Sequence, residues 1–428
     1  MKQVPNAGIK MPFQKEDWHI KRFKYLFKKL NRPVMDDDGV ITAFRDGLVT
    51  LRSNRRMDGF TFADKEIGYQ GVEPNDLVIH AMDSFAGAIG VSDSRGKCSP
   101  VYSIAIPINP NATYPKFWGY YLRNLATAGF IESLAKGIRE RSTDFRWKDI
   151  SNLLVNFPNY EIQKGIADFL DRETDRIDQL IEKKKLLNSI LHLKEKIALR
   201  DLLVDIDAKK WRLRHIGKMK NGTGFPTELQ GNHNEEVAFF KVKHLQTFGL
   251  DNPICNSEDT ISRDMAKNLR ASIFPKGTIV FAKIGAALLL ARFATLGCDA
   301  CIDNNMAAFV PKKTLINTEF LLLTLTQIDM NTMVQPGTVP SLNTEAFNNF
   351  RVPLPTIEQQ ISLIAEFRSI RNPILAALSK NKSSIEKLRE FRTSLITEAV
   401  TGQLDINSWK KRGNTDKRLD NIEESMRT

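Results

Sequence analysis

Val352-Pro-Leu-Pro-Thr-Ile-Glu-Gln-Gln repeats, with changes, an earlier stretch of the chain, Val155-Asn-Phe-Pro-Asn-Tyr-Glu-Ile-Gln. A proline, a glutamate and a glutamine of the second stretch each lie 197 positions after their counterparts in the first. A long segment of charged and apolar residues with helical spacing follows each stretch. A period of about 200 residues is too long for a solenoid repeat. The sequence therefore predicts two copies of a domain, each followed by a helix.

Shorter similarities elsewhere in the chain support the repeat. Trp18 and Trp211 open the two copies, and Glu73-Pro-Asn-Asp-Leu-Val-Ile-His-Ala-Met matches Phe274-Pro-Lys-Gly-Thr-Ile-Val-Phe-Ala-Lys. In each copy, short apolar runs indicate strands, and a segment with apolar residues three and four apart indicates a helix. The simplest account is one α+β domain of about 140 residues in each half.

These patterns predict an α+β fold with five segments. The two domains span residues 1–157 and 208–353, and the two helical segments span residues 158–207 and 354–406. Residues 407–428 form a charged tail that is sparse in apolar residues, and we expect it to be disordered because it cannot bury enough apolar surface to order itself.

The two helical segments have the spacing of a coiled coil, because steps of three and four residues relate their apolar positions. The predicted seam consists of Ile166, Leu170, Ile177, Leu180, Leu187 and Leu191 in the first segment and of Leu378, Ile385, Leu388 and Leu395 in the second. Alternatively, each helix packs alone on its own domain. Helices of about 40 residues are about 60 Å long, however, and exceed the width of such a domain. We therefore expect the helices to pair antiparallel, with a kink or a break at Pro373.

The composition indicates a soluble protein with a basic surface. The 428 residues are 42% hydrophobic and 26% charged, with a net charge of +12 and four cysteines. No apolar run is long enough to span a membrane, and the start of the chain has no secretory signal. We expect a cytoplasmic protein without disulfides. Its positive charge suits a polyanion such as DNA, although a basic protein that binds no nucleic acid has the same composition.

The motifs typical of catalytic and metal sites are absent or incomplete. Gly90-Val-Ser-Asp-Ser-Arg-Gly-Lys-Cys has the wrong spacing for a phosphate-binding loop, and Phe85-Ala-Gly-Ala-Ile-Gly is favoured as a tight turn. Cys298-Asp-Ala-Cys301 is a single pair, whereas structural zinc needs four ligands. Cys255 and His244 could complete such a set, but buried free thiols are the favoured interpretation. We expect no catalytic residue, metal or cofactor in this chain.

Clusters of basic and polar residues are the candidates for DNA contact. Arginine is the best suited, because its planar guanidinium matches both a guanine edge and phosphate oxygens. The candidates in the first copy are Arg52, Arg55, Arg56, Arg139, Arg141, Arg146 and Lys148. Those in the second copy are Lys218, Lys220, Asn221, Thr223, Lys241, Lys243 and Lys283. For each one, a solvated surface role is at least as common as base contact.

Over nearly its whole length, the chain resembles the specificity subunits of type I restriction–modification systems. Two domains, each closed by a Pro-x-x-Glu-x-Gln element and a long helix, are the pattern of that family. The most specific part is Val352-Pro-Leu-Pro-Thr-Ile-Glu-Gln-Gln with the later Leu388-Arg-Glu-Phe-Arg-Thr-Ser-Leu-Ile-Thr-Glu-Ala-Val-Thr-Gly-Gln-Leu-Asp. The first copy departs from it, since Phe157-Pro-Asn-Tyr-Glu-Ile-Gln lacks the leading proline and the double glutamine.

The resemblance implies a function that the residues alone do not give. Each domain would be a target-recognition domain that reads one half of a bipartite site in double-stranded DNA, and the helices would set the gap between the halves. The helices would also dock two methyltransferase subunits, and restriction subunits that translocate DNA would join this core. S-adenosylmethionine, ATP and magnesium would belong to those partners. The rival functions are a stand-alone methyltransferase or nuclease with a divergent site, and a coiled-coil adaptor that does not read DNA.

Overall fold

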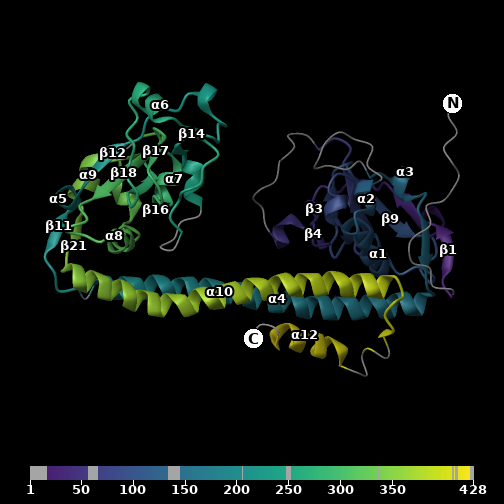
Figure 1. Cartoon of the computed structure of the whole chain (residues 1–428). Coiled ribbons are helices and arrows are strands. Elements are labelled where there is room, and N and C mark those ends of the chain that lie inside the picture. Colours follow the sequence, from purple (N-terminus) through teal and green to yellow (C-terminus); the bar gives the residue numbers. More distant parts are fainter. Residues whose placement is uncertain are drawn as a thin grey trace. The chain divides into compact units, whose positions relative to one another are not determined.

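A computed structural model of the chain describes residues 17–55, 66–133, 145–204, 206–246, 252–335, 337–406, 409 and 413–424. The chain divides into two compact units (Figure 1). The first combines residues up to Leu186 with those from Lys380 onward, and the second comprises Leu187–Ser379. Each unit therefore contains one α+β domain, one part of the first long helix and one part of the second.

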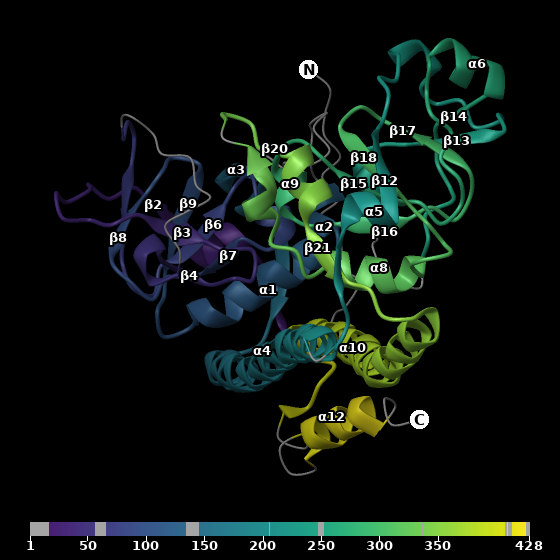
Figure 2. The ribbon, with the colours of Figure 1, turned by 90° about the vertical axis from the view of Figure 1, so that its left-hand side faces the viewer.

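The domain of the first unit is built on a four-stranded sheet with the strand order β2-β9-β6-β7. These strands are β2 (Phe27–Leu30), β9 (Tyr102–Pro107), β6 (Leu77–His80) and β7 (Ile89–Val91). Two antiparallel pairs accompany the sheet: β3 (Ile41–Ala43) with β4 (Val49–Leu51), and β5 (Gln70–Val72) with β8 (Gly96–Cys98). The helices are α1 (Pro115–Thr127), α2 (Phe130–Ser133) and α3 (Trp147–Ile150), with 3-10 turns η1 (Phe23–Tyr25), η2 (Arg52–Asn54) and η3 (Ser84–Ala86). Figure 2 shows α1 beside this sheet.

The domain of the second unit repeats that order in its own sheet, β12-β18-β15-β16. These strands are β12 (Gly217–Asn221), β18 (Met306–Pro311), β15 (Ile279–Ala282) and β16 (Phe293–Thr295). A second sheet has the strand order β14 (Thr260–Ile261), β13 (Val237–Phe240) and β17 (Ala300–Ile302). A separate two-stranded sheet pairs β19 (Val334–Gln335) with β20 (Ser341–Leu342). The helices are α5 (Leu213–Ile216), α6 (Arg263–Asn268), α7 (Ala286–Leu289), α8 (Thr318–Leu325) and α9 (Thr344–Asn349), with turns η4 (Thr227–Leu229), η5 (Val242–Gln246) and η6 (Met330–Met333). The equal strand order confirms the repeat that the sequence predicts.

An antiparallel strand pair joins the start and the end of each domain. In the first unit, β1 (His19–Arg22) pairs with β10 (Leu154–Phe157). In the second, β11 (Lys210–Arg212) pairs with β21 (Arg351–Pro353). Because β10 and β21 run directly into the long helices, each domain is closed at the point where its helix begins.

The two long helices are α4 (Tyr160–Val204) and α10 (Ile357–Val400). Side chains at the start of each helix accept hydrogen bonds from its first turn: Asn159 Oδ1 from the Ile162 N–H at 3.0 Å and Thr356 Oγ1 from the Gln359 N–H at 3.3 Å. Such caps satisfy donors that have no partner within the helix. In each unit the beginning of one helix packs against the end of the other, as the sequence predicts for an antiparallel coiled coil.

The seam is buried most tightly in the first unit. Its buried predicted positions are Ile166, Leu170, Ile177, Ile385, Leu388 and Leu395, and Leu180 is half-buried. In the second unit, Leu191 and Leu378 are half-buried. Leu187 lies off the seam with 45% of its surface exposed. Ile181 is buried and Asn188 is half-buried. Each lies one residue after a predicted seam position, Leu180 and Leu187 respectively, and the two are seven residues apart, as successive seam positions are.

Two further features of the helices bear on the sequence-based expectations. Pro373 lies inside α10, which continues through it to Val400, so the helix does not break there, and the predicted kink stays a prediction. The charged tail contains an ordered helix, α12 (Asn414–Glu424), in which Thr415 and Leu419 are buried. Tertiary contacts with α4 and α10 order this segment, which its composition alone does not predict.

Candidate DNA-binding surface and its helical support

In the first domain, the structure engages some of the candidate DNA-binding residues with other protein groups. The Nε of Arg52 donates a hydrogen bond to Thr42 Oγ1 at 2.9 Å. Arg55 forms an ion pair with Asp46 at 2.6 Å, and its guanidinium lies over the Phe44 ring. Arg56, Arg139 and Arg141 lie outside the described residues. These contacts orient Arg52 and Arg55 within the domain, and they leave fewer of their donors for a ligand.

At the start of α3, Arg146 and Lys148 are exposed. Asp149 accepts a hydrogen bond from the backbone N–H of Arg146 at 3.4 Å, which caps the helix. The neighbouring Phe145 is buried in the core of the unit, so its packing fixes the position of this turn. Arg146 and Lys148 are therefore an exposed basic pair among the described candidates of the first domain, and Arg55 is exposed as well but is ion-paired with Asp46.

In the second domain, the lysines fall into two groups. Lys218 and Lys220 are exposed on the edge strand β12, where residues two apart share one face. Asn221 is exposed, and Thr223 and Lys283 are half-buried. Within the described part of the chain, the side chains of Lys218, Lys220 and Lys283 show no hydrogen bond or ion pair, so their charges remain available to a polyanion.

Lys241 and Lys243 are paired with carboxylates. Lys241 forms an ion pair with Asp259 at 2.8 Å and also donates to Gln230. Burial raises the pKa of Asp259, but hydrogen bonds from Lys241 and the Gly231 N–H, together with the charges of Lys241 and Lys243, outweigh burial and hold the pKa below its ordinary value. Lys243 pairs with Glu258. Lys241 is therefore a structural lysine in this arrangement.

A buried glutamine fixes each domain to its own helix. The Oε1 of Gln163 accepts from the Tyr114 N–H at 3.0 Å, and its Nε2 donates to the carbonyls of Ala112 and Pro158 at 3.2 and 2.9 Å. Its side chain is completely buried. In a single amide, this residue thus joins the first turn of α4 to the loop before α1.

Gln360 repeats these contacts in the second unit. Its Oε1 accepts from the Asn317 N–H at 2.7 Å, and its Nε2 donates to Leu315 and Pro355 carbonyls at 3.1 and 2.9 Å. The repeated Pro-x-x-Glu-x-Gln element is therefore the joint between domain and helix. The sequence reveals the repetition of this glutamine, but its partners in the domain, Asn317 and Leu315, lie 43 and 45 positions away in the chain.

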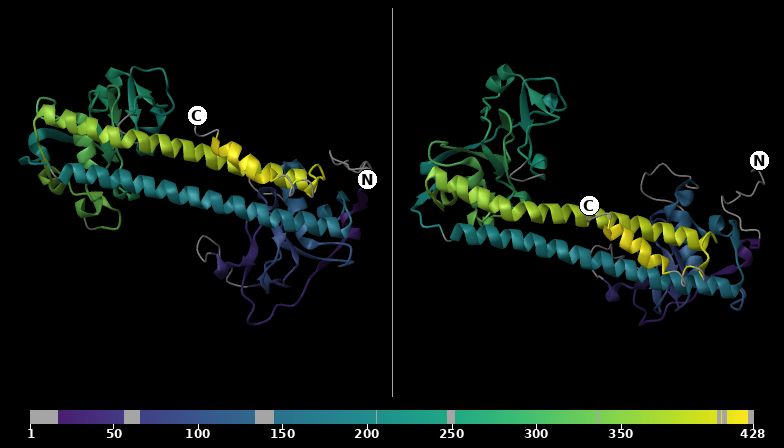
Figure 3. Two further views of the ribbon diagram at one scale, coloured as in Figure 1. Left: turned by 90° about the horizontal axis from the view of Figure 1, so that it is seen from below. Right: turned by 60° about the horizontal axis from the view of Figure 1, so that its bottom comes forward.

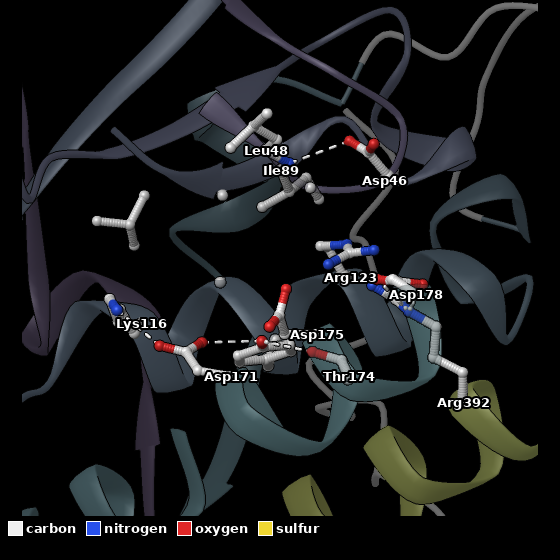
Figure 4. A pocket seen from close by; sticks show the side chains of 15 residues that line it. Asp46, Leu48, Ile89, Lys116, Arg123, Asp171, Thr174, Asp175, Asp178 and Arg392 are labelled. Atoms are coloured by element: carbon white, nitrogen blue, oxygen red, sulfur yellow. Dashed lines mark hydrogen bonds and ion pairs between the residues drawn. The ribbon is translucent and has the colours of Figure 1, made fainter. Parts of the chain in front are cut away.

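A cavity of about 450 Å³ lies between α1, α4, α10 and the β3–β4 turn of the first unit (Figure 4). Arg123 of α1 points toward Asp178 and Arg392 in this view. Burial and the nearby charge of Arg392 lower the pKa of Arg123 to about 10. Gly47 has φ +91°, and a Cβ there would lie 2.3 Å from the Arg123 guanidinium. The turn therefore needs glycine for both its conformation and its space.

Ion pairs hold each domain against its long helix. In the first unit, Lys116 of α1 pairs with Asp171 of α4 at 2.6 Å. In the second, Glu319 of α8 pairs with Arg368 of α10 at 2.7 Å. The signs of the charges are opposite in the two copies, although the positions correspond. Each domain thus has its own electrostatic match to its own helix.

The described residues offer no metal site of three or more histidine, cysteine or acidic side chains. Cys98 and Cys301 are buried free thiols, and burial raises their pKa values to about 12 and about 11. Cys255 is exposed, and the Cys298 thiol donates to its carbonyl oxygen at 3.3 Å. Gly87, in the glycine-rich stretch after Phe85, adopts φ +91° as in a tight turn. Among the described residues, no helix is both long and apolar enough to cross a membrane.

Known proteins resemble this chain in sequence and in fold. Residues 206–370 match the type I restriction modification DNA specificity domain. The chain carries a type I DNA specificity domain. Type I restriction enzyme MjaVIII specificity subunit of Methanocaldococcus jannaschii is 21% identical to this chain over 422 residues, which cover 94% of this chain and 95% of the relative.

Two solved structures share the fold of this chain. The HsdS subunit from Thermoanaerobacter tengcongensis superposes with a TM-score of 0.50 at 14% identity, covering 92% of this chain and 99% of that one. A chain from a study of complex assembly and conformational transition of the type I R-M system reaches a TM-score of 0.68 at 14% identity, covering 91% and 99%. The domain match and the relative are both to type I specificity proteins, and the solved structures show that the fold is shared.

Proposed function

We propose that this specificity subunit reads a bipartite site in double-stranded DNA, one half with each domain, and contributes no catalytic group of its own. The repeat supports this proposal: two sheets have the same strand order, and each domain is closed by a strand pair and joined to a long helix by an equivalent buried glutamine. Two similar modules on one scaffold suit a site with two separate halves.

The two modules differ in the side chains they offer to DNA. Arg146 and Lys148 lie on a short helix of the first domain, whereas Lys218 and Lys220 lie on an edge strand of the second. Base edges and phosphates are contacted by such exposed cations, and sequence is read where their geometry matches the groove. The halves of the site therefore have different sequences.

The long helices have two roles in this proposal: one concerns the gap between the half-sites, and the other concerns assembly with the other subunits. Under this proposal they set the length of the unread spacer and dock two methyltransferase subunits, which restriction subunits then join. S-adenosylmethionine, ATP and magnesium belong to those partners, and the complex acts in the cytoplasm.

Methylome sequencing tests the proposal. A strain that lacks its own restriction–modification systems would express this chain with the methyltransferase subunit. We expect one methylated motif with two unlike halves and an unread spacer of fixed length. Omission of this chain is the control and should abolish the motif. Methylation without the chain, or a continuous motif, contradicts the proposal.

A further inference from the structure

A further cavity, of about 330 Å³, lies in the first unit where the domain meets the end of α10. Figure 3 shows this end of α10, drawn in yellow, beside the first domain. A hydrogen bond joins the two, because Thr397 Oγ1 of α10 donates to Asn124 Oδ1 of α1 at 2.6 Å. We call this space the joint cavity, since residues of the domain and of α10 line it together.

Apolar side chains form most of the wall of the joint cavity. Trp18, Tyr121 and Phe130 contribute aromatic rings, and Leu125 and Val400 contribute aliphatic groups. Tyr121, Leu125 and Val400 are buried, and the other two are half-buried. None of the described residues that line the cavity is charged. Such a wall suits an uncharged aromatic ring, because aromatic side chains pack favourably against other rings.

Asn156 brings uncommitted hydrogen-bonding groups into the joint cavity. Successive residues of a strand face opposite sides, so its side chain points away from the core that Val155 and Phe157 of β10 join. Asn156 is 5% exposed. Within the described part of the chain, neither its Oδ1 nor its Nδ2 has a hydrogen-bond partner. Buried polar groups nearly always have one, so this amide is suited to a partner that a ligand supplies.

The neighbouring hydroxyl groups already donate to protein acceptors. Ser133 Oγ donates to a carbonyl of its own helix at 2.7 Å, and Thr401 Oγ1 donates to the Thr397 carbonyl at 2.6 Å. The hydroxyl of Thr397 itself is bonded to Asn124. A buried water needs two to four polar partners, and these bonds leave few of them beside Asn156. A molecule that combines an apolar ring with one polar edge matches the cavity better.

The second copy of the domain lacks this amide. The 197-residue offset of the repeat places Pro353 of β21 at the position of Asn156. The closing strand pair nevertheless forms in both copies, β1 with β10 and β11 with β21. Closure of the domain therefore does not need an amide at this position, and the buried amide of the first copy has another role.

We propose that the joint cavity binds a small, uncharged heteroaromatic molecule with a hydrogen-bond donor beside an acceptor on one edge, as in adenine. The Asn156 amide holds an acceptor and a donor side by side in one plane, and asparagine pairs in this way with the amino group and a ring nitrogen of adenine. Ligand pockets measure about 300–1,000 Å³, so this one suits a molecule of the size of a base. The inference goes beyond the proposed function, because the lining residues are not among the candidate DNA contacts.

A ligand in the joint cavity contacts the first domain and the end of α10 at the same time. A molecule that binds only the folded chain stabilises it, so an occupied cavity holds this domain more firmly against α10. The repeat does not provide the same amide in the second unit. The first unit therefore responds to the small molecule and the second does not.

Isothermal titration calorimetry with the full chain tests the proposal. Adenine is the probe, and we expect one molecule bound per chain. Purine has the same rings without the amino group and should bind at least tenfold more weakly, because it leaves Asn156 Oδ1 without a donor. Adenosine monophosphate should also bind at least tenfold more weakly, because no described lining residue offers a cation to its phosphate. No binding of adenine, or equal binding of either other compound, overturns the proposal.

Two variants of the cavity test its residues. Asn156→Leu removes the amide and should abolish adenine binding without lowering the melting temperature of the free chain, because it removes a buried polar group that has no protein partner. Thr401→Phe fills the cavity with a ring, leaves Asn156 in place and should also abolish binding. Asn111→Leu makes the first substitution at an exposed position of the same domain and should leave binding unchanged. Adenine binding that persists in either folded cavity variant contradicts the proposal.

Hydrogen exchange measured by mass spectrometry locates the ligand on the full chain. Adenine should slow exchange at residues 121–133 and 397–401. Helix α8 of the second unit, which corresponds to α1, is the internal control and should exchange as before. Slower exchange at other segments, with these two unchanged, places the ligand elsewhere and overturns the assignment. No DNA enters these measurements, so their outcome is independent of the proposed function.

Discussion

At the scale of single residues, Gln163 and Gln360 show how one side chain sets a joint. Each amide makes three hydrogen bonds with backbone groups on both sides of the domain–helix boundary, and each is completely buried. A buried amide is stabilising only when its partners are all present, because a buried polar group without a partner costs about 1–3 kcal/mol.

Gln163→Leu should destabilise the first unit by about 3 kcal/mol, because it leaves the Tyr114 N–H and two carbonyls without their partner. Hydrogen exchange measured by mass spectrometry should lose protection around residues 112–114 and at the start of α4. Gln360→Leu should produce the same loss around residues 315–317 only. Lys164→Ala, on the exposed side of the same turn, is the control. Unchanged protection in Gln163→Leu would falsify the assignment of the joint.

The exposed cations at the start of α3 give a second prediction. Arg146→Ala should cost about 1–3 kcal/mol of binding free energy and relax specificity at one base pair if it contacts a base edge. Lys148→Ala should weaken binding to all sequences alike if it contacts phosphate, and should reduce the salt dependence. Competition binding against every single-base variant of the site measures both. Lys241→Ala should instead lower stability, because Asp259 loses its ion pair. If neither substitution at α3 alters affinity or specificity, this turn does not contact DNA.

At the scale of elements, the coiled coil combines an apolar seam with polar contacts that fix the alignment of the two helices. Asn381 is buried, and its Nδ2 donates to the Lys184 carbonyl at 2.7 Å. Arg392 pairs with Asp178 in the first unit, and Arg371 pairs with Glu195 in the second. A polar residue at a seam position sets register at a cost in stability. The pairing of α4 and α10 is therefore specific as well as apolar.

An insertion of four residues after Ala198 should lengthen the unread spacer by one or two base pairs. The insertion adds about 6 Å and about one helical turn to α4, and DNA rises about 3.4 Å per base pair. Methylome sequencing of the variant measures the spacer directly. Alanine at the exposed Lys194 and Lys196 keeps the helix length and is the control. Full activity with the original spacer would show that α4 does not set the distance.

At the scale of the whole molecule, the chain is a repeat with two separable modules. Each domain has its own core, its own closing strand pair and its own joint to a helix. Opposite charge signs at Lys116–Asp171 and Glu319–Arg368 match each domain to its own helix. Modules built in this way can be replaced one at a time when these boundary contacts are kept.

Replacement of residues 211–352 by the second domain of another specificity subunit should alter only one half of the methylated motif. The reciprocal replacement, of residues 18–157, should alter only the other half. Methylome sequencing of both chimaeras provides the comparison, and each chimaera serves as the control for the other. A simultaneous change in both half-sites contradicts independent reading by the two domains.

The sequence by itself determined the repeat, the α+β class and the two long helices. Strands are indicated by short apolar runs or by a period of two, and helices by apolar residues three and four apart. The repeat is indicated by the 197-residue offset between the two copies. The phase of the seam was not determined in this way. Apolar residues stand side by side at Leu180–Ile181 and Leu186–Leu187, so local spacing alone could not decide which of them faces the other helix.

Tertiary structure alone decided the order of the C-terminal segment and the availability of the candidate cations. α12 is too charged to fold by composition, but Trp409, Leu419 and Arg418 find partners on α4 and α10. Lys241 and Lys218 look alike in sequence, yet Lys241 is paired with Asp259, 18 positions away, and Lys218 is exposed on an edge strand. Such pairings depend on residues distant in the chain, which periodicity and composition do not encode.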